Sequence, residues 1–154
     1  MEWALDLGYR SIDTAAVYHN EAEVGAAIRQ SGLDRESIFL TTKVWNTDQG
    51  YDATMAAFDA SLQRLGMAYA DLYLVHWPVE GLFSETWRAL EDLYGAGRVR
   101  SIGVSNFLVH HLEELLTSAH VVPMVNQVEF HPRLQQPDLQ AFCEDHDICL
   151  EAWR

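Results

Sequence analysis

The sequence predicts an α/β domain in which parallel strands alternate with helices and form a β/α barrel. Six strand-like runs alternate strictly with helix-like runs along the 154 residues, an order typical of a parallel sheet with right-handed crossovers. An open doubly wound sheet is the competing architecture. It is disfavoured because the only Gly-x-Gly, Gly95-Ala96-Gly97, follows a helical run and precedes a strand, the reverse of a dinucleotide-binding fingerprint. No linker, repeat or low-complexity stretch divides the chain, so we expect residues 1–154 to form one domain.

Helices are predicted where apolar residues recur at a spacing of three or four and a helix-ending residue follows. In the run that begins at Glu21, for example, Val24, Ala27 and Ile28 share one face and Gly32 follows. In chain order, the helices are predicted at Glu2–Gly8 (the end of a helix), Glu21–Gln30, Ala53–Leu65, Ser84–Tyr94, Val109–Thr117 and Asp138–His146.

Strands are predicted where short apolar runs lie between these helices. The run from Ala70 to His76 is an example, and it ends where Trp77-Pro78 interrupts the pattern. In chain order, the strands are predicted at Tyr9–Thr14, Ile38–Val44, Ala70–His76, Ser101–Ser105, Met124–Phe130 and Ile148–Trp153.

Charge and composition argue against several classes of partner. The net charge of -13 disfavours nucleic acid and anionic membranes, and no apolar run approaches the roughly 20 residues of a membrane span. The first residues do not resemble a signal peptide, so we expect a cytoplasmic location. Cys143 and Cys149 are expected to be reduced. No metal site is predicted, because His110 and Glu114 share a helix face without a third ligand.

Polar residues lie at the carboxyl ends of the predicted strands, where β/α barrels build their active sites. Lys43 is the most informative, because it is the only lysine beside nine arginines and lies in an apolar run. The pKa and partners of a lysine can be tuned, whereas those of a guanidinium cannot. Singly, such residues have ordinary explanations, for example a turn cap for Asp13 or a satisfied core histidine for His76, but these do not explain a shared location. The full set is Asp13, Lys43, His76, Ser105, Asn106, Gln127, Glu129 and Trp153.

Tyr18 follows the first predicted strand and is expected to point into the same mouth. A lysine ammonium near the phenol would lower the pKa of Tyr18, and Asp13 would pair with Lys43. His76 would donate a hydrogen bond to a substrate oxygen. These residues predict a general acid that delivers a proton to a carbonyl during its reduction by hydride, and the hydride would come from a nicotinamide cofactor.

Six short motifs occur in a fixed order along the chain. They are Gly8-Tyr9-Arg10-Ser11-Ile12-Asp13-Thr14-Ala15 followed by Tyr18, Thr42-Lys43-Val44-Trp45, Leu74-Val75-His76-Trp77-Pro78, Ile102-Gly103-Val104-Ser105-Asn106-Phe107, Asn126-Gln127-Val128-Glu129 and Glu151-Ala152-Trp153. This ordered set resembles the aldo-keto reductase family over essentially the whole chain. The last motif resembles the bacterial branch that reduces 2,5-diketo-gluconate and small aldehydes.

The resemblance implies a (β/α)8 barrel, NADPH as the cofactor and a small carbonyl compound as the substrate. It implies that Tyr18 is the proton donor, that Lys43 and Asp13 tune it, and that His76 orients the carbonyl. It further implies that the nicotinamide carboxamide is bound by Ser105, Asn106 and Gln127 and that Trp153 stacks on the nicotinamide ring. Trp45 and Trp77 would form the walls of the substrate pocket.

The predicted barrel is incomplete. Six strand units are present where a barrel needs eight, and 154 residues fall below the roughly 200 of such barrels. By the resemblance, the first and last strands and the basic segment that binds the cofactor phosphates are missing, so we expect a chain truncated at both ends. The predicted function is NADPH-dependent reduction of aldehydes or ketones; the alternative is an inactive barrel remnant that acts only through protein contacts. The open sheet edges are available for pairing, and the sequence leaves the oligomeric state open.

Overall fold

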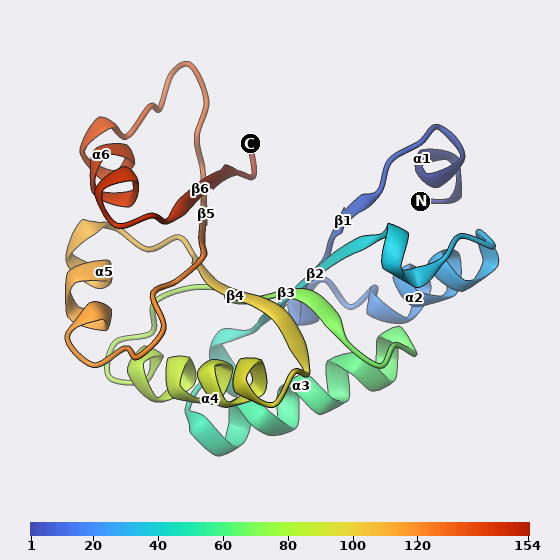
Figure 1. Ribbon diagram of the computed structural model, residues 1–154, viewed down its shortest axis with the longest axis horizontal. Helices are drawn as coiled ribbons and strands as arrows, with labels where there is room; N and C mark the ends of the chain where they lie inside the picture. The colour runs from blue at the N-terminus through green and yellow to red at the C-terminus, as the bar shows by residue number, and fades with distance from the viewer.

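The computed structural model describes residues 1–154 as an open half-barrel built on six parallel strands (Figure 1). The strands follow one another in the sheet in chain order, and every neighbouring pair is parallel. This confirms the predicted incomplete barrel. The strands are β1 (Ser11–Asp13), β2 (Phe39–Val44), β3 (Ala70–Val75), β4 (Val99–Ser105), β5 (Val125–Val128) and β6 (Cys149–Ala152).

Helices cover the convex outer side of this curled sheet (Figure 1). Its concave side faces the space between two arms, one that carries β1 and one that carries β5 and β6 (Figure 1). An open doubly wound sheet would carry helices on both faces, so that alternative is excluded. All predicted elements are present, with boundaries shifted by at most two residues. The helices are α1 (Glu2–Asp6), α2 (Glu21–Gln30), α3 (Tyr51–Leu65), α4 (Phe83–Gly95), α5 (Val109–Leu116) and α6 (Pro137–Asp145), and the short 3-10 turns are η1 (Ala16–Tyr18), η2 (Arg35–Ser37) and η3 (Asn46–Asp48).

The register of the strands puts the polar residues on one face of the sheet. Lys43 pairs with Leu74, and His76 lies two residues beyond Leu74. Because side chains along a strand alternate between faces, Lys43 and His76 lie on the same face. Ser105 pairs with Gln127 in the same way. Continued across all six strands, the register assigns to this inner face Asp13, Lys43, His76, Ser105, Gln127 and Glu151.

The opposite face of the sheet packs against the helices and forms the main core. Tyr73 and Val104, both fully buried, belong to one apolar cluster with Phe58 of α3 and Leu90 of α4. The rings of Phe58 and Tyr73 meet edge to face at 4.7 Å between centroids. Burial of this apolar surface stabilises the curvature of the sheet, and the curvature brings the inner-face residues toward one another.

A buried carboxylate braces the opposite end of the sheet, where β3 begins. The side chain of Asp71, which is 2% exposed, accepts a hydrogen bond from the backbone N–H of Leu40 at 2.9 Å. It also pairs with Arg35 at 2.7 Å and with Arg100 at 3.0 Å. The polar residues are therefore segregated by role, with this structural cluster at one end of the strands and the candidate site at the other.

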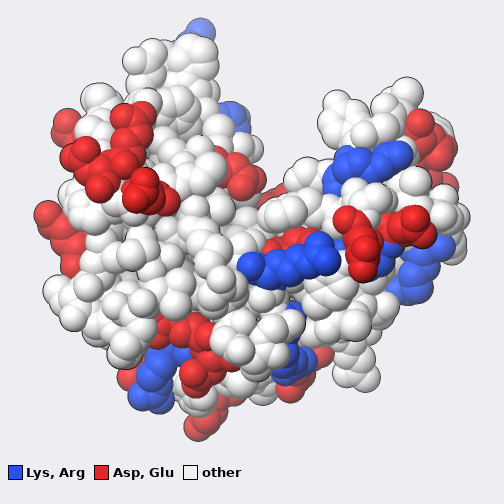
Figure 2. All heavy atoms as spheres, viewed as in Figure 1, with Lys and Arg blue, Asp and Glu red and all other residues white.

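Strands β1 and β6 each have a neighbour on one side only, and the two chain termini lie near the tips of the two arms (Figure 1). The basic side chains visible in Figure 2 lie singly or beside acidic ones and form no continuous patch on that face. No helix combines the length and the apolar character that a membrane crossing requires.

Candidate active site

A cavity of about 310 Å³ lies at the carboxyl ends of the strands. All eight of its lining residues are among those predicted from the sequence. They are Asp13, Tyr18, His76, Trp77, Ser105, Asn106, Gln127 and Trp153. Of the other predicted residues, Lys43 and Trp45 lie directly behind this lining, against Asp13 and His76 respectively, and Glu129 lies outside the cavity.

Lys43 is buried at the base of the site, with a relative exposure of 1%. Its ammonium group donates hydrogen bonds to the carboxylate of Asp13 and, at 3.0 Å, to the backbone carbonyl of Thr14. The Nζ atom also lies 5.3 Å from the centroid of the Tyr18 ring. The buried positive charge thus has a counter-charge on β1 and lies beside the phenol, as the sequence predicted.

Tyr18 lies at the end of the turn η1 and is about half exposed. Burial, and secondly the negative charge of Asp13, raise the pKa of its phenol above the ordinary value of 10. The predicted lowering of this pKa by Lys43 is therefore wrong for the protein in this state. The physical reasons are that burial disfavours the charged phenolate and that Asp13 both neutralises the ammonium of Lys43 and itself repels a phenolate.

His76 follows β3 and is almost fully buried. Burial, and secondly the charge of Lys43, lower its pKa to about 4, so the imidazole is neutral at physiological pH. Its Nδ1 atom is buried without a hydrogen-bond partner. The ring meets Tyr18 edge to face at 5.7 Å and Trp45 at 5.1 Å between centroids. A neutral imidazole held in this way can donate one N–H to a ligand without adding charge.

Amide and hydroxyl groups form a connected network on the other wall of the cavity. The hydroxyl of Ser105 donates to the backbone carbonyl of Gln127 at 2.7 Å, and Asn106 Nδ2 donates to Ser105 Oγ and to the carbonyl of His76, each at 3.0 Å. Asn106, which adopts a left-handed φ of 63°, accepts a hydrogen bond from Trp153 Nε1 at 3.1 Å. The network orients the Trp153 ring toward the cavity that it lines.

Gln127 connects the two arms of the half-barrel. Its Nε2 donates to Asp13 Oδ2 on β1 at 2.8 Å and to Glu151 Oε1 on β6 at 2.9 Å. Strands β1 and β5 are not neighbours in the sheet, so this contact crosses the concave space. The role of Glu151 in the site was not predicted, although it lies two residues before Trp153 and hence on the same strand face.

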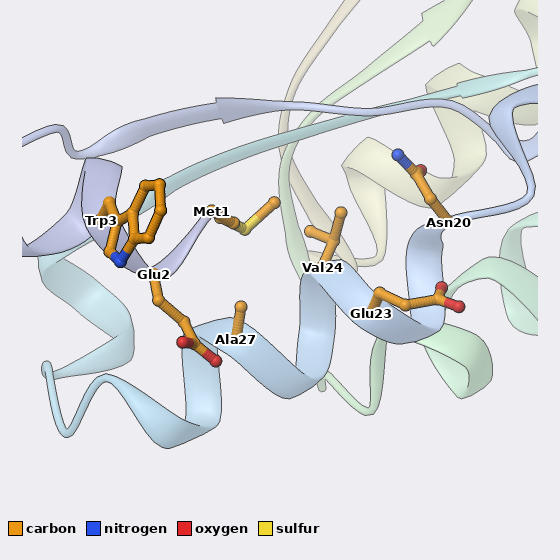
Figure 3. A pocket seen from close by; sticks show the side chains of 7 residues that line it. All are labelled: Met1, Glu2, Trp3, Asn20, Glu23, Val24 and Ala27. Carbon is orange, nitrogen blue, oxygen red and sulfur yellow. The ribbon is translucent and has the colours of Figure 1, made fainter.

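Two other features lie outside this cluster. The carboxylate of Glu129 lies 3.1 Å from His131 Nε2 and does not line the cavity. A larger cavity of about 590 Å³ lies between α1 and α2, beside the edge of β1 (Figure 3). It is lined by Met1, Glu2, Trp3, Asn20, Glu23, Val24 and Ala27. No His, Lys, Arg, Tyr, Ser, Thr or Cys side chain lines it, so the smaller cavity is the better candidate for chemistry.

The fold and the site together are those of a β/α-barrel protein with its reactive groups at the carboxyl ends of the strands. The sequence profile of the Aldo/keto reductase family matches residues 1–154. The chain belongs to the aldo-keto reductase family.

Individual relatives agree with this assignment. Glyoxal reductase of Bacillus subtilis (strain 168) is 61% identical over 150 residues, which cover 97% of this chain and 54% of the relative. A crystal structure of an aldo/keto reductase from Brucella melitensis is 55% identical with a TM-score of 0.96, over 99% of this chain and 60% of that one. A Bombyx mori aldo-keto reductase in complex with NADP is 38% identical with a TM-score of 0.94, over 99% and 54%. The chain thus spans about half the length of the curated relatives that it matches.

Proposed function

We propose that this chain carries the proton-donating part of an NADPH-dependent reductase of small aldehydes and ketones, with Tyr18 as the general acid. The observation that carries the proposal is the convergence of Tyr18, His76 and the Lys43–Asp13 pair on one cavity at the carboxyl ends of the strands. The relative named glyoxal reductase and the neighbour bound to NADP support the reaction class and the cofactor.

The raised pKa of Tyr18 suits a proton donor, because the phenol keeps its proton at neutral pH until the substrate oxygen develops negative charge. Once the proton is transferred, the ammonium of Lys43, 5.3 Å from the ring centroid, stabilises the phenolate. Asp13 keeps that ammonium charged and in place. The neutral imidazole of His76 donates a hydrogen bond to the same substrate oxygen and fixes its position beside the phenol.

The cavity residues fit the nicotinamide end of the cofactor. Gln127 Oε1 accepts no hydrogen bond from the protein and is not buried. It is therefore available to accept a hydrogen bond from an amide N–H of a ligand. Ser105 and Asn106 add polar groups beside it, and the Trp153 ring offers a stacking surface. When bound, the cofactor supplies the hydride. Trp77 lines the cavity and Trp45 packs on His76, so we assign both to the substrate wall.

The proposed setting is the cytoplasm, where NADPH chemistry is carried out in a reducing environment. Cys143 and Cys149 are both free thiols, which is consistent with that environment. No lining residue of the cavity is Lys or Arg, so we expect the chain itself to bind the phosphates of the cofactor weakly.

The test is oxidation of NADPH, supplied up to millimolar concentration, in the presence of glyoxal. We expect substrate-dependent turnover that falls by about 10²-fold or more in Tyr18→Phe. Tyr9→Phe is the matched control, because Tyr9 is exposed and outside the cavity, and it should retain the wild-type rate. Equal rates in Tyr18→Phe and wild type would contradict the proton-donor role. Neither turnover nor NADPH-dependent quenching of tryptophan fluorescence would favour the alternative, an inactive barrel remnant.

A further inference from the structure

The side-chain amide of Gln127 is held by carboxylates on both sides. Its Nε2 donates to Asp13 Oδ2 at 2.8 Å and to Glu151 Oε1 at 2.9 Å. A primary amide nitrogen carries two protons, so both are used within the protein. The amide oxygen is left without a protein partner, in a residue that lines the cavity. Gln127 therefore presents a hydrogen-bond acceptor, its amide oxygen, to a ligand in the cavity.

The sheet register makes the contact with Glu151 a built feature. Gln127 and Glu151 are paired residues of β5 and β6, so their side chains project from the same face at adjacent positions. Asp13, the other acceptor, is shared with the ammonium of Lys43 through its Oδ1 atom. Of the two acceptors of the Gln127 amide, only Glu151 is not also paired with the ammonium of Lys43.

Reversal of the Gln127 amide would place its oxygen against two carboxylates. The contacts would then be between acceptors with no proton between them, and the nitrogen would lose both charge-assisted hydrogen bonds. We propose that Glu151 is a positioning residue that fixes the amide of Gln127 with its oxygen toward the cavity, so that the site selects a ligand presenting an N–H donor, such as a carboxamide, over one presenting a carboxylate. The identity of that ligand as a nicotinamide dinucleotide rests on the proposed function, whereas the orientation of the amide does not.

The orientation is tested without any ligand, by NMR of the Gln127 side-chain amide in ¹⁵N-labelled protein. We expect both Nε2 protons to exchange slowly with solvent in the wild type. In Glu151→Ala one of them should exchange about tenfold faster, the effect of losing one charge-assisted hydrogen bond. Glu151→Gln retains an acceptor oxygen and should restore protection. Exchange rates that are the same in Glu151→Ala and wild type would overturn the proposal.

The selectivity is tested by comparing NADP⁺ with its nicotinic acid analogue, in which a carboxylate replaces the carboxamide, by quenching of tryptophan fluorescence. We expect the preference of the wild type for NADP⁺ to fall about tenfold in Glu151→Ala. The matched control is Glu144→Ala, because Glu144 accepts a glutamine amide at 2.9 Å in the same way, from Gln140 on the exposed face of α6. The control should retain the wild-type ratio.

The two experiments distinguish a failure of the proposed function from a failure of the role that we assign to Glu151. Wild-type protein that binds neither dinucleotide would contradict the proposed function, and the exchange rates of the Gln127 amide would still decide the role of Glu151. An unchanged preference in Glu151→Ala, in protein that does bind NADP⁺, would overturn the selectivity that we assign to Glu151.

Discussion

Gly25 in helix α2 lies where this helix crosses the end of α3, and no larger residue fits there. A Cβ atom added at Gly25 would lie 1.8 Å from the carbonyl oxygen, 2.5 Å from the carbonyl carbon and 2.8 Å from the Cα of Leu65. All three are backbone atoms, so no side-chain rotation relieves the contact. We predict that Gly25→Ala destabilises the protein, although alanine is normally the better helix former.

The magnitude follows from opposing effects. Ordinary contact needs about 3.5 Å, so the helices would have to separate by more than an ångström. Overpacking of this kind costs about 1–3 kcal/mol, and the hydrogen bond from Arg29 Nη1 to Leu65 O, 2.5 Å long, would be strained, which costs about another 1 kcal/mol. Alanine recovers up to about 1 kcal/mol of helix propensity. We therefore expect a net loss of about 2 kcal/mol in the free energy of unfolding.

The assay is urea unfolding followed by circular dichroism, supported by thermal melts, in which 2 kcal/mol corresponds to roughly 4–8 °C for a domain of this size. Gly95→Ala is the matched control, because Gly95 is also a helical glycine, the last residue of α4, but has no atom within 4 Å of an added Cβ. It should be neutral or stabilised by up to about 1 kcal/mol. If Gly25→Ala were as stable as Gly95→Ala, the assigned packing of α2 on α3 would be refuted.

Two further predictions concern buried charge and protonation. Asp71→Asn should cost about 3 kcal/mol of stability, because it leaves two arginines without their buried counter-charge. Asp59→Asn, which removes a charge from an exposed ion pair, should change stability by less than about 1 kcal/mol. Equal effects of the two substitutions in urea titrations would contradict the structural role of Asp71. His76 has a folded-state pKa of about 4, below the ordinary 6.5, so the unfolded chain takes up this proton first and stability is lost as pH falls from about 6.5 to 4. His76→Gln should lose less stability over that interval than the wild type. Parallel stability curves for the two proteins would exclude the effect.

Much of the fold could be predicted because the signals were local. Helices such as α2 show apolar residues at helical spacing, and strands such as β3 are short, continuously apolar runs. The turns η1 and η3 were not predicted, because three-residue 3-10 turns leave no periodic pattern. This matters for the site, since η1 carries Tyr18.

Most members of the candidate site were also predicted, with Glu151 missed and Glu129 wrongly included, but the electrostatics of the site were not predicted. Residues at the carboxyl ends of parallel strands must converge, so Asp13, Lys43 and His76 could be grouped from their sequence positions. The pKa of Tyr18 could not, because its direction depends on burial and on where Asp13 lies relative to the phenol. A sequence does not give those distances, and opposing effects of an anion and a cation are resolved only by distance.

The sequence by itself therefore determined the kind of structure and the chemical groups: an alternating β/α chain, one lysine among arginines, and polar residues placed at strand ends. Only the tertiary structure decided how these groups are connected. The curl of the sheet brings Gln127 of β5 within 2.8 Å of Asp13 on β1, and the strand register sets Glu151 beside it. The first of these contacts joins residues that are 114 positions apart. It depends on the packing of helices on the outer face, which no local pattern specifies.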